Sequence, residues 1–407
     1  MTDDIRLAAI RAGAQPSAGP EGTDLVAPPA LSSARSYPDL DALDAAMEAD
    51  PRAYRRHGND SVALLEATLA WLEAPPGGGM PCARATASGQ AALLLLVSAA
   101  AMSGRRRVVL VRPCYGATEA LLAGPLAALG ASLSVVDLPR AGEPVDVRRL
   151  LEPVLDRDVA VVVVEIVTNP LLTVVDVPEV AAAAHACGAV CLVDSTIATP
   201  FLFQPLANGA DLVMHSLTKH LGGHSDLLGG VAIATADSEV SGWLDATSRA
   251  LGAVLSPFDA WLTLRGLRTA PLRVERGTAS AAMLALAVAD HPGVVAVHHP
   301  LARGGSDGAL AARLLPRGVG PMVSIEVRGG GVGAGRVVRA LEGIRLAATF
   351  GDVSTTVSHP ASTSHRHLSP ESRESLGISD GLLRFSIGIE DEQTLLVELT
   401  SALAAAG

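Results

Sequence analysis

The sequence has few cysteines, few basic residues and no long apolar run, and each shortage excludes a class of protein. Its 407 residues include 4 cysteines, too few for the disulfide framework of a small secreted domain. Basic residues number 31 against 42 acidic ones, and the resulting net charge of -11 argues against binding to nucleic acid or anionic membranes. Lysine is scarce, because most of the basic residues are arginine.

The longest apolar runs are too short to cross a membrane, although the mean hydropathy is positive at +0.36. Ala91–Met102 and Val159–Val167 both fall short of the roughly 20 residues that a spanning helix needs. The first residues also lack the sustained apolar stretch of a signal peptide. We therefore expect a cytoplasmic protein whose apolar residues are buried in a core or between subunits.

From about residue 61 onward, short Val- and Ile-rich segments alternate with longer Ala- and Leu-rich ones. The expected strands are Arg107–Val111, Ser132–Val136, Val159–Val164, Val190–Val193, Leu212–His215 and Gly230–Ala234. The expected helices between them include Ala91–Met102, Thr118–Leu129 and Val177–Cys187. Apolar strands separated by helices predict an α/β fold with a doubly wound, mostly parallel sheet that is covered on both faces.

The pattern divides the chain into three parts. Residues 1–57 carry several prolines and are expected to form an N-terminal arm and subunit-contact segment, with one helix near Asp39–Glu48. Residues 58–255 hold the doubly wound sheet, and residues 256–407 form a smaller α+β domain. In that last part the expected strands and helices are Met322–Val327, Leu382–Ile387, Asp259–Arg268, Arg273–Ala289, Arg336–Leu341 and Glu392–Ala405.

Polar side chains follow four of the expected strands at the point where each strand ends. A doubly wound sheet binds its ligands beyond the carboxyl ends of the strands, so these side chains are expected to converge. They provide an aromatic ring, an amide, a carboxylate and a cluster of hydroxyls with an amine. The residues, in chain order, are Tyr115, Asn169, Asp194, Ser216, Thr218 and Lys219.

A phosphate site is suggested by Ala87-Ser88-Gly89-Gln90, which opens an expected helix. Ser88 is a favourable N-cap, and Gly89 allows a ligand to approach the backbone closely. The free N–H groups of a helix N-terminus bind phosphate, and nearby hydroxyls add hydrogen bonds. A capped helix without a ligand needs the same residues, so both interpretations stay open here.

Lys219 and Asp194 point to a particular cofactor. A lysine at a strand end, among hydroxyls and glycines, indicates an amine able to form a Schiff base, although a solvated surface lysine fits the same sequence. Asp194 follows an apolar run and is costly to bury unless it meets a cation, such as a pyridinium nitrogen. Tyr115 would stack on that ring or pack at an interface. Together with the phosphate site, these groups predict bound pyridoxal phosphate.

The motifs resemble those of the Cys/Met-metabolism pyridoxal-phosphate enzymes, the group of cystathionine γ-synthase, cystathionine γ-lyase, methionine γ-lyase and the homoserine-ester sulfhydrylases. The resemblance covers roughly residues 54 to 400, in order, and is most specific around Lys219. The matching stretches are Tyr54-Arg-Arg56-His-Gly-Asn59, Ala87-Ser-Gly89-Gln-Ala-Ala, Cys114-Tyr-Gly-Ala-Thr118, Glu165 to Pro170, Val193-Asp194-Ser-Thr196, His215-Ser-Leu-Thr-Lys219-His-Leu-Gly-Gly-His-Ser-Asp226, Ser256-Pro-Phe-Asp259, Arg265-Gly-Leu-Arg-Thr269, His359-Pro-Ala-Ser-Thr-Ser-His365 and Leu383-Arg384-Phe-Ser-Ile-Gly-Ile-Glu390.

The resemblance implies a fold-type-I enzyme with pyridoxal 5'-phosphate bound in residues 58–255. Lys219 would hold the cofactor as a Schiff base and move protons, with Tyr115 stacked on the ring as the second catalytic group. Asp194 would pair with the ring nitrogen, and Asn169 would approach the ring hydroxyl and the substrate. The remaining cofactor-binding residues would be Ser88, Gly89, Gln90, Thr196, Ser216 and Thr218.

The family pattern also implies how substrate and subunits are arranged. Arg384 would bind the substrate α-carboxylate, and Thr349 would lie beside the lysine and the substrate. Tyr54 and Arg56 would reach the phosphate of a neighbouring subunit. The resemblance therefore implies a homo-oligomer with shared active sites, at least a dimer and usually a tetramer.

Several residues depart from the family pattern, and they fall at the substrate mouth and the subunit contact. The clearest departures are Asn59-Asp60-Ser61, Ser195 and Thr349-Phe350-Gly351. Ala117 replaces a cysteine typical of methionine γ-lyases, and Ala348 does not favour an amine-bearing substrate such as cystathionine. None of these changes removes a cofactor-binding group, so they leave the cofactor secure and the substrate open.

The expected reaction is γ-replacement on an O-activated homoserine, of trans-sulfuration type, through a vinylglycine-type intermediate. Two alternatives stay open: γ- or β-elimination by the same groups, and a specialised γ-substitution that forms a carbon–carbon or carbon–heteroatom bond. No metal site is expected at His359, His365 and His367, which have no supporting acidic or cysteine cluster. The run Gly329–Ala334 fits a dinucleotide fingerprint but has too little chain after it, so a strand-to-helix turn is favoured.

Overall fold

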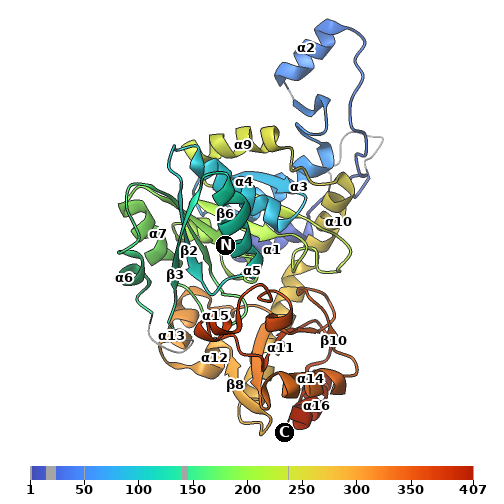
Figure 1. Ribbon diagram of the computed structural model, residues 1–407. Coiled ribbons are helices and arrows are strands. Elements are labelled where there is room, and N and C mark those ends of the chain that lie inside the picture. Colours follow the sequence, from blue (N-terminus) through green and yellow to red (C-terminus); the bar gives the residue numbers. More distant parts are fainter. Residues whose placement is uncertain (1, 15–23, 50, 140–144, 237, 407) are drawn as a thin grey trace.

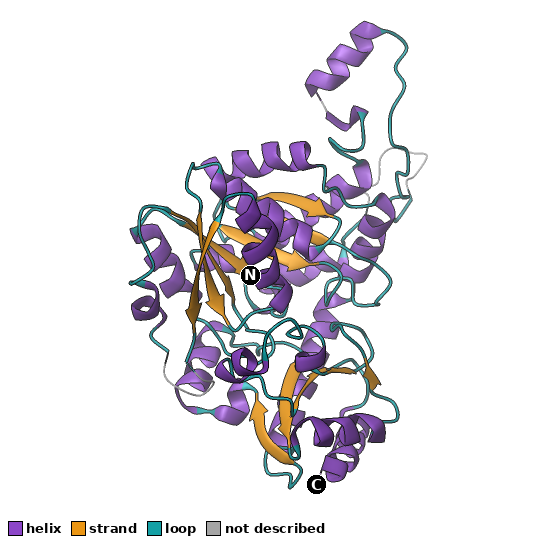
Figure 2. Cartoon of the chain, in the orientation of Figure 1, coloured by secondary structure: helices purple, strands orange, loops and turns teal. Residues whose placement is uncertain are grey.

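A computed structural model describes residues 2–14, 24–49, 51–139, 145–236 and 238–406. The described chain contains two β-sheets, one of 7 strands and one of 5 strands. Figure 1 shows the larger sheet in the upper part of the molecule and the smaller sheet below it, next to the C-terminus. Helices lie around both sheets, as the colouring by secondary structure makes clear in Figure 2.

The larger sheet is mostly parallel. Its strand order is β1-β7-β6-β5-β4-β2-β3, in which β7 runs antiparallel to both of its neighbours. The strands are β1 (Cys82–Thr86), β2 (Arg107–Arg112), β3 (Ser132–Asp137), β4 (Val159–Glu165), β5 (Val190–Asp194), β6 (Leu212–Ser216) and β7 (Gly230–Ala234). Parallel pairing brings the carboxyl ends of β2, β4, β5 and β6 to one edge, where Glu165 lies opposite Asp194.

Alternating side chains of the central strands enter two separate cores. Val161 and Val163 of β4 pack with α4 (Gly89–Ala101) and α9 (Glu239–Leu251) on one face. Val162 and Val164 pack with α3 (Asp60–Glu73) and α7 (Val177–Ala186) on the other face. Each fully buried Val or Leu stabilises the fold by roughly 1.5–3 kcal/mol. The uninterrupted valine run of β4 is therefore explained by burial on both faces.

The smaller sheet is largely antiparallel, with the order β10-β11-β12-β9-β8. Its strands are β8 (Val294–His298), β9 (Met322–Val327), β10 (Arg345–Leu346), β11 (Thr356–Ser358) and β12 (Leu382–Ser386). A core built around Phe385 joins this sheet to α11 (Ala270–Ala287), α14 (Gly330–Ala340) and α16 (Glu392–Leu403).

The N-terminal part of the described chain includes α1 (Thr2–Ile10), α2 (Leu40–Ala49) and the 3-10 helix η1 (Pro51–Ala53). Figure 1 shows α2 standing away from the rest of the chain. The remaining helical elements are α5 (Gly116–Leu121), η2 (Leu122–Leu126), α6 (Val147–Leu151), α8 (Thr199–Leu202), η3 (Pro205–Asn208), α10 (Pro257–Leu267), α12 (Pro300–Arg303), α13 (Gly305–Leu314), η4 (Pro360–Ser362), α15 (Pro370–Ser375) and η5 (Ala404–Ala406). Within the described residues, no helix combines the length and the apolar character that crossing a membrane requires.

The sequence-based expectations hold for the fold class and for every strand predicted, each within about a residue of its observed ends. Two expectations need correction. A second helix (α1) precedes Asp39–Glu48, and the expected helix Thr118–Leu129 is divided into α5 and the π-helical η2, which contains Pro125.

The glycine run after β9 begins in the expected strand-to-helix turn, at Gly329, and continues as helix from Gly330. Gly329 has a φ of +77° and directs the chain into α14, which begins at Gly330. A Cβ on Gly333 would overlap the Arg328 carbonyl oxygen. Small residues at this point therefore allow close packing of the first turn, which explains the run without a bound nucleotide.

Candidate active site

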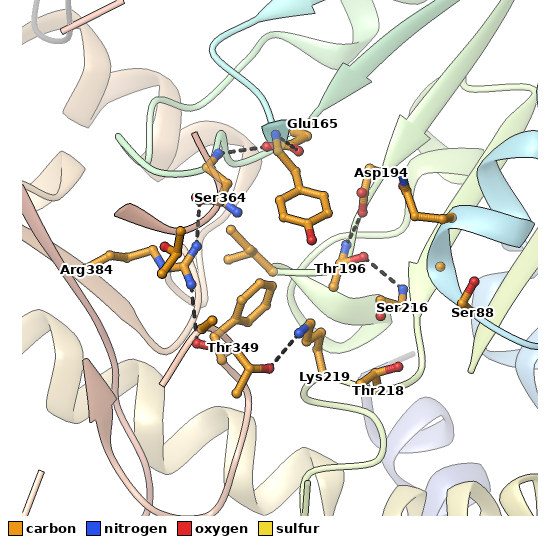
Figure 3. A pocket seen from close by; sticks show the side chains of 18 of the residues that line it. Ser88, Glu165, Asp194, Thr196, Ser216, Thr218, Lys219, Thr349, Ser364 and Arg384 are labelled. Atoms are coloured by element: carbon orange, nitrogen blue, oxygen red, sulfur yellow. Dashed lines mark hydrogen bonds between the residues drawn. The ribbon is translucent and has the colours of Figure 1, made fainter. Parts of the chain in front are cut away.

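A cavity of about 520 Å³ lies at the carboxyl edge of the larger sheet, and residues from both sheets line it (Figure 3). Twelve of the residues singled out from the sequence line this cavity. They are Ser88, Gly89, Gln90, Tyr115, Asn169, Asp194, Thr196, Ser216, Thr218, Lys219, Thr349 and Arg384. Ser88 and Arg384, which are 296 positions apart in the sequence, share this cavity because residues of both sheets line it.

One end of the cavity is a cup formed by the start of α4. Ser88 caps this helix, and its Oγ accepts a hydrogen bond from the N–H of Ala91 at 3.1 Å. A Cβ on Gly89 would come within 3.1 Å of the Ser216 Cβ, and one on Gly230 would overlap the Ser88 carbonyl. The two glycines are thus required for the helix end to approach β6 and β7, which leaves a helix N-terminus facing the cavity.

Asp194, Thr196 and Ser216 form a short chain of hydrogen bonds between strand ends. The N–H of Thr196 donates to Asp194 Oδ1, and the N–H of Ser216 donates to Thr196 Oγ1, both at 2.9 Å. Burial raises the pKa of the Asp194 carboxyl above its ordinary range. A cation placed against this carboxylate would offset the cost of keeping it ionised there.

The amine of Lys219 lies between the two sheets. Its Nζ donates a hydrogen bond to Thr349 Oγ1 at 2.6 Å, and the ring centroid of Phe350 lies 4.9 Å away (Figure 3). Burial, with a smaller contribution from the positive charge of Arg384, lowers the pKa of Lys219 to about 8. An uncharged amine is the form that can act as a nucleophile or take up a proton, and the lowered pKa favours that form.

Arg384 is the buried cation of the cavity, with 4% of its surface exposed. Its Nη1 donates to Asn169 Oδ1 at 2.7 Å, and its Nη2 donates to the Thr349 carbonyl oxygen at 3.3 Å. Burial lowers its pKa to about 10, so the guanidinium stays charged at neutral pH. Nε is buried and has no hydrogen-bond partner within the described ranges, which suits a cation that meets an anionic ligand.

Glu165 is a site residue to which the sequence had assigned no role. Its Oε1 accepts the N–H of Tyr115, and its Oε2 accepts the N–H of Asn169, both at 2.7 Å. Burial, together with the neighbouring charge of Asp194, raises the pKa of Glu165 to about 8. This carboxyl group holds the two loops that carry the aromatic ring and the amide. A carboxylate at the end of an all-valine strand was the signal that could have identified it.

The mouth of the cavity is formed by a segment that follows η4. Ser362, Thr363, Ser364 and Arg366 all line the cavity, as do Phe350 and Ala348. His365 fixes the segment, because its Nε2 donates to the Cys114 carbonyl oxygen at 2.9 Å. Burial lowers the pKa of His365 to about 4, so the ring is neutral at pH 7. The sequence alone did not single out Arg366.

Two of the predicted site residues lie outside this cavity. Tyr54 is 51% exposed, and the Arg56 guanidinium lies 5.8 Å from the centre of its ring. Arg56 Nη1 also donates to the Arg249 carbonyl oxygen at 2.9 Å. Both residues therefore present polar groups at the surface of the chain and away from its own Lys219 pocket.

The histidines near the mouth have protein partners instead of a shared metal geometry. His359 Nδ1 lies 2.7 Å from Ser362 Oγ, and its Nε2 lies 2.8 Å from the Asp380 carbonyl oxygen. Across the part of the chain that the structure describes, no group of three or more His, Cys, Asp or Glu side chains could hold a metal ion.

The groups in the cavity fit pyridoxal phosphate. The glycine-lined cup suits a phosphate, the buried Asp194 suits a protonated ring nitrogen, and Tyr115 offers a ring for stacking. The amine of Lys219 lies in the same space with a lowered pKa. Each feature was predicted separately from the sequence, and the structure brings them into one cavity.

Comparisons with known proteins agree with this assignment. The family model described as "Cys/Met metabolism PLP-dependent enzyme" matches residues 8–404. The L-methionine gamma-lyase of Streptomyces avermitilis is 39% identical over 366 residues, which is 90% of this chain and 79% of the relative. The O-succinylhomoserine sulfhydrylase of Pseudomonas aeruginosa is 36% identical over 403 residues, covering 98% of this chain and 94% of the relative.

Solved structures of enzymes of this group also superpose on the chain. A cystathionine gamma synthase from Xanthomonas oryzae pv. oryzae, in complex with aminoacrylate and cysteine, superposes with a TM-score of 0.86 at 35% identity and covers 99% of this chain and 98% of its own. The cystathione gamma lyase CalE6 from Micromonospora echinospora has a TM-score of 0.85, also at 35% identity, with coverage of 98% and 99%. The chain therefore belongs to the family of Cys/Met metabolism PLP-dependent enzymes.

Proposed function

We propose that this enzyme catalyses γ-replacement on an O-activated homoserine, exchanging the ester group at Cγ for a nucleophile. The observation that carries the proposal is the bridge formed by Thr349, whose Oγ1 binds Lys219 Nζ at 2.6 Å and whose carbonyl oxygen binds Arg384 Nη2 at 3.3 Å. A proton-transferring amine and a carboxylate-binding guanidinium are thus held at a fixed separation. That arrangement orients an amino acid by its α-carboxylate, with its side chain extending past the amine.

The larger sheet would hold the cofactor. Ser88, Gly89, Gln90, Ser216 and Thr218 surround the phosphate position in this proposal. Asp194 keeps the ring nitrogen protonated, Tyr115 stacks on the ring, and Thr196 holds the Asp194 carboxylate in place through the 2.9 Å hydrogen bond from its N–H. When bound, pyridoxal phosphate supplies an electron sink that stabilises negative charge at the substrate α- and β-carbons.

Lys219 would bind the cofactor and then carry protons for the reaction. With substrate bound, the Lys219 amine would remove the proton from Cα and would then act at Cβ, where proton loss expels the γ-substituent. A pKa of about 8 leaves a substantial uncharged fraction at neutral pH, and the same group can return the proton later. Arg384 holds the α-carboxylate throughout, and Asn169 fixes the guanidinium from the other side.

Replacement is favoured over cystathionine cleavage by the lining of the mouth. Ala348 and the hydroxyls of Ser362, Thr363 and Ser364 line this part of the cavity. A distal ammonium group requires an acidic partner, and among the described lining residues the carboxylates are Glu165 and Asp194, which lie at strand ends of the larger sheet. An ester group, in contrast, carries no positive charge and needs no acidic partner.

The second candidate function is γ-elimination, which yields a 2-oxo acid and ammonia. It is favoured by the 39% identity to a protein named L-methionine gamma-lyase. The two reactions share every proton transfer up to the loss of the γ-substituent and differ in whether a nucleophile or a proton is then added at Cγ. The same residues therefore serve both candidates.

Product analysis distinguishes γ-replacement from γ-elimination. Purified holoenzyme is incubated with O-acetyl- or O-succinyl-L-homoserine, with and without sulfide or L-cysteine, and the products are identified by mass spectrometry. We expect a new carbon–sulfur bond at Cγ that forms only when the thiol is present. If 2-oxobutanoate and ammonia are released at the same rate with and without thiol, the enzyme catalyses γ-elimination and the proposed γ-replacement is wrong.

We also propose that Tyr54 and Arg56 complete the phosphate site of a neighbouring copy, in at least a dimer. The proposal is supported by the exposure of both residues, by their absence from the lining of the Lys219 cavity, and by the resemblance of Tyr54-Arg-Arg56-His-Gly-Asn59 to the family motif. Mixing an inactive Lys219→Ala protein with an inactive Arg56→Ala protein should restore about a quarter of the wild-type activity if one full site forms per hybrid dimer. Activity that stays at the level of the separate variants would exclude a shared site.

A further inference from the structure

A second arginine lines the cavity and is not used by the reaction derived above. Arg366 is exposed at the mouth, whereas Arg384 is buried in the interior. Within the described residues, the Arg366 guanidinium makes no ion pair and no side-chain hydrogen bond, so its charge and its donors are available. An exposed guanidinium that lines a cavity and has no protein partner keeps its N–H donors free to bind a ligand.

The backbone that carries Arg366 is held in a defined place. The His365 N–H donates to the Pro360 carbonyl oxygen at 3.0 Å, and His365 Nε2 donates to Cys114 at 2.9 Å. A Cβ on Gly116 would overlap the Ser364 carbonyl oxygen and lie 2.6 Å from the His367 ring. The segment therefore packs against the start of α5, directly beside Tyr115, and presents Arg366 to the cavity in a fixed register.

The surroundings of Arg366 suit an anion. The neighbouring hydroxyls of Ser362, Thr363 and Ser364 are hydrogen-bonded to His359 and His365, so the guanidinium of Arg366 supplies the free donors at the mouth. Both carboxylates among the described lining residues are already engaged: Glu165 accepts two backbone N–H groups, and Asp194 accepts the Thr196 N–H. A guanidinium binds carboxylate or phosphate oxygens through paired N–H donors, so this end of the cavity recognises a negatively charged group.

We propose that Arg366 binds an anionic group at the far end of the γ-substituent, so that the preferred donor is a homoserine ester carrying a free carboxylate or a phosphate. The inference rests on the proposed function, because it assigns Arg384 to the α-carboxylate and the ester to the mouth. A neutral acetyl ester lacks the group that Arg366 would contact. Arg366 is thus a specificity-determining residue, not a catalytic one.

Binding can be tested without turnover. L-2-aminosuberate and L-2-aminooctanoate have the same chain length and no leaving group at Cγ, and they differ only in a terminal carboxylate. Their affinities for the holoenzyme are measured from the change in the cofactor's absorbance and from the thermal shift. Wild-type enzyme should bind 2-aminosuberate more tightly, and Arg366→Ala should weaken it by roughly fivefold to tenfold while leaving 2-aminooctanoate unchanged.

Two further variants make the result specific. Arg366→Lys keeps the charge and should retain part of the preference, because a lysine cannot form the paired hydrogen bonds. Arg345→Ala removes an exposed arginine of β10 that does not line the cavity, and it should behave like the wild type. Equal affinity of wild-type enzyme for the two analogues, or equal weakening of both by Arg366→Ala, would overturn the proposal.

Steady-state kinetics show whether the anionic group of the preferred donor is a carboxylate or a phosphate. With O-succinyl-, O-phospho- and O-acetyl-L-homoserine as donors, Arg366→Ala should raise KM for one anionic ester and leave kcat, and KM for the acetyl ester, unchanged. The anionic ester whose KM rises more in Arg366→Ala is then identified as the preferred donor. If 2-aminosuberate binds through Arg366 but no ester reacts, the proposed function fails and the anion site stands. If the esters react and Arg366→Ala does not change KM, the anion site is excluded and the proposed function is retained.

Discussion

The two walls of the cavity are built in different ways. On the cofactor wall, formed by the larger sheet, Tyr115, Asp194 and Lys219 lie at or just after the ends of parallel strands. Hydrogen bonds between neighbouring strand ends hold Asp194, and Glu165 accepts the N–H of Tyr115. On the substrate wall, formed by the C-terminal part, Thr349, Phe350, Arg366 and Arg384 come from a strand and from loops. Contacts across 130, 215 and 251 residues of sequence join this wall to the first.

This difference assigns a separate task to each wall. Groups fixed by a parallel sheet keep their geometry when loops change, which suits a cofactor that must be held in one place. Groups carried by loops can differ in sequence without disturbing the sheet, which suits the choice of substrate. Substitutions in the cofactor wall should therefore remove the chemistry, and substitutions in the substrate wall should alter which molecule reacts.

The largest effect is expected on the cofactor wall, from Lys219→Ala. Lys219 is the only lysine in the printed sequence, so no other side-chain amine can take its place. We expect kcat to fall by about 10²–10⁴-fold and the absorbance of the covalently bound cofactor to disappear. Spectra and initial rates measure both; a variant that keeps its rate and its spectrum would contradict the assignment.

Arg384→Ala is expected to have the next largest effect and to separate the two walls. The loss of the buried guanidinium should lower kcat/KM by roughly 10²–10³-fold while the cofactor stays bound. Arg345→Ala removes an arginine of the same sheet outside the cavity and serves as the control. Arg384→Lys keeps a positive charge at this position and shows whether the chain still folds. Loss of cofactor from a folded Arg384→Lys protein would show that the walls are not independent.

Phe350→Leu tests the substrate wall at its centre. The ring lies 4.9 Å from Lys219 Nζ and 5.1 Å from the Arg384 guanidinium carbon, so its removal weakens two cation–π contacts. We expect kcat/KM to fall by about twofold to tenfold, with unchanged cofactor content. Competition between esters of different size should also become less selective. Identical kinetics for the variant and the wild type would mean that this ring does not shape the site.

The smallest effect concerns the pH dependence of the mouth segment. The pKa of His365 in the folded chain, about 4, lies below its ordinary value of 6.5, so the unfolded chain takes up the proton first as pH falls. Its contribution to stability is present above pH 6.5 and is lost as pH falls to about 4, by roughly 1–3 kcal/mol. His365→Gln should reduce the difference in urea midpoint between pH 7 and pH 5. An unchanged difference would assign the acid sensitivity to other buried histidines, such as His220.

The sequence indicated that the residues of the cofactor wall lie at one edge of the sheet, because they follow a local rule. Apolar runs end at Asp194 and before Ser216, and parallel strands bring such ends to one edge. The strands missed, β1, β8, β10 and β11, are short or lie at or near sheet edges, where the apolar pattern is weak. The division into residues 1–57, 58–255 and 256–407 stays a prediction.

The substrate wall was harder to predict because its geometry depends on contacts between distant segments. Arg384 was assigned through family resemblance, and no local pattern indicates that its partner is Asn169. In the sequence, Arg366 is one charged residue in a polar loop, and nothing nearby links it to the site. The contacts of His365 and Gly116 place that loop at the cavity. Such positions follow from tertiary packing, which a pattern of apolar residues does not specify.

The most direct test of the account is to locate the cofactor on the chain. Borohydride reduction of the purified holoenzyme makes the bond between the cofactor and its amine permanent, and digestion with mass spectrometry then identifies the labelled peptide. We predict one reduced cofactor per chain, on the peptide that contains Lys219, and no label in Lys219→Ala. A label on the N-terminal amine, or no label on an active enzyme, would contradict it.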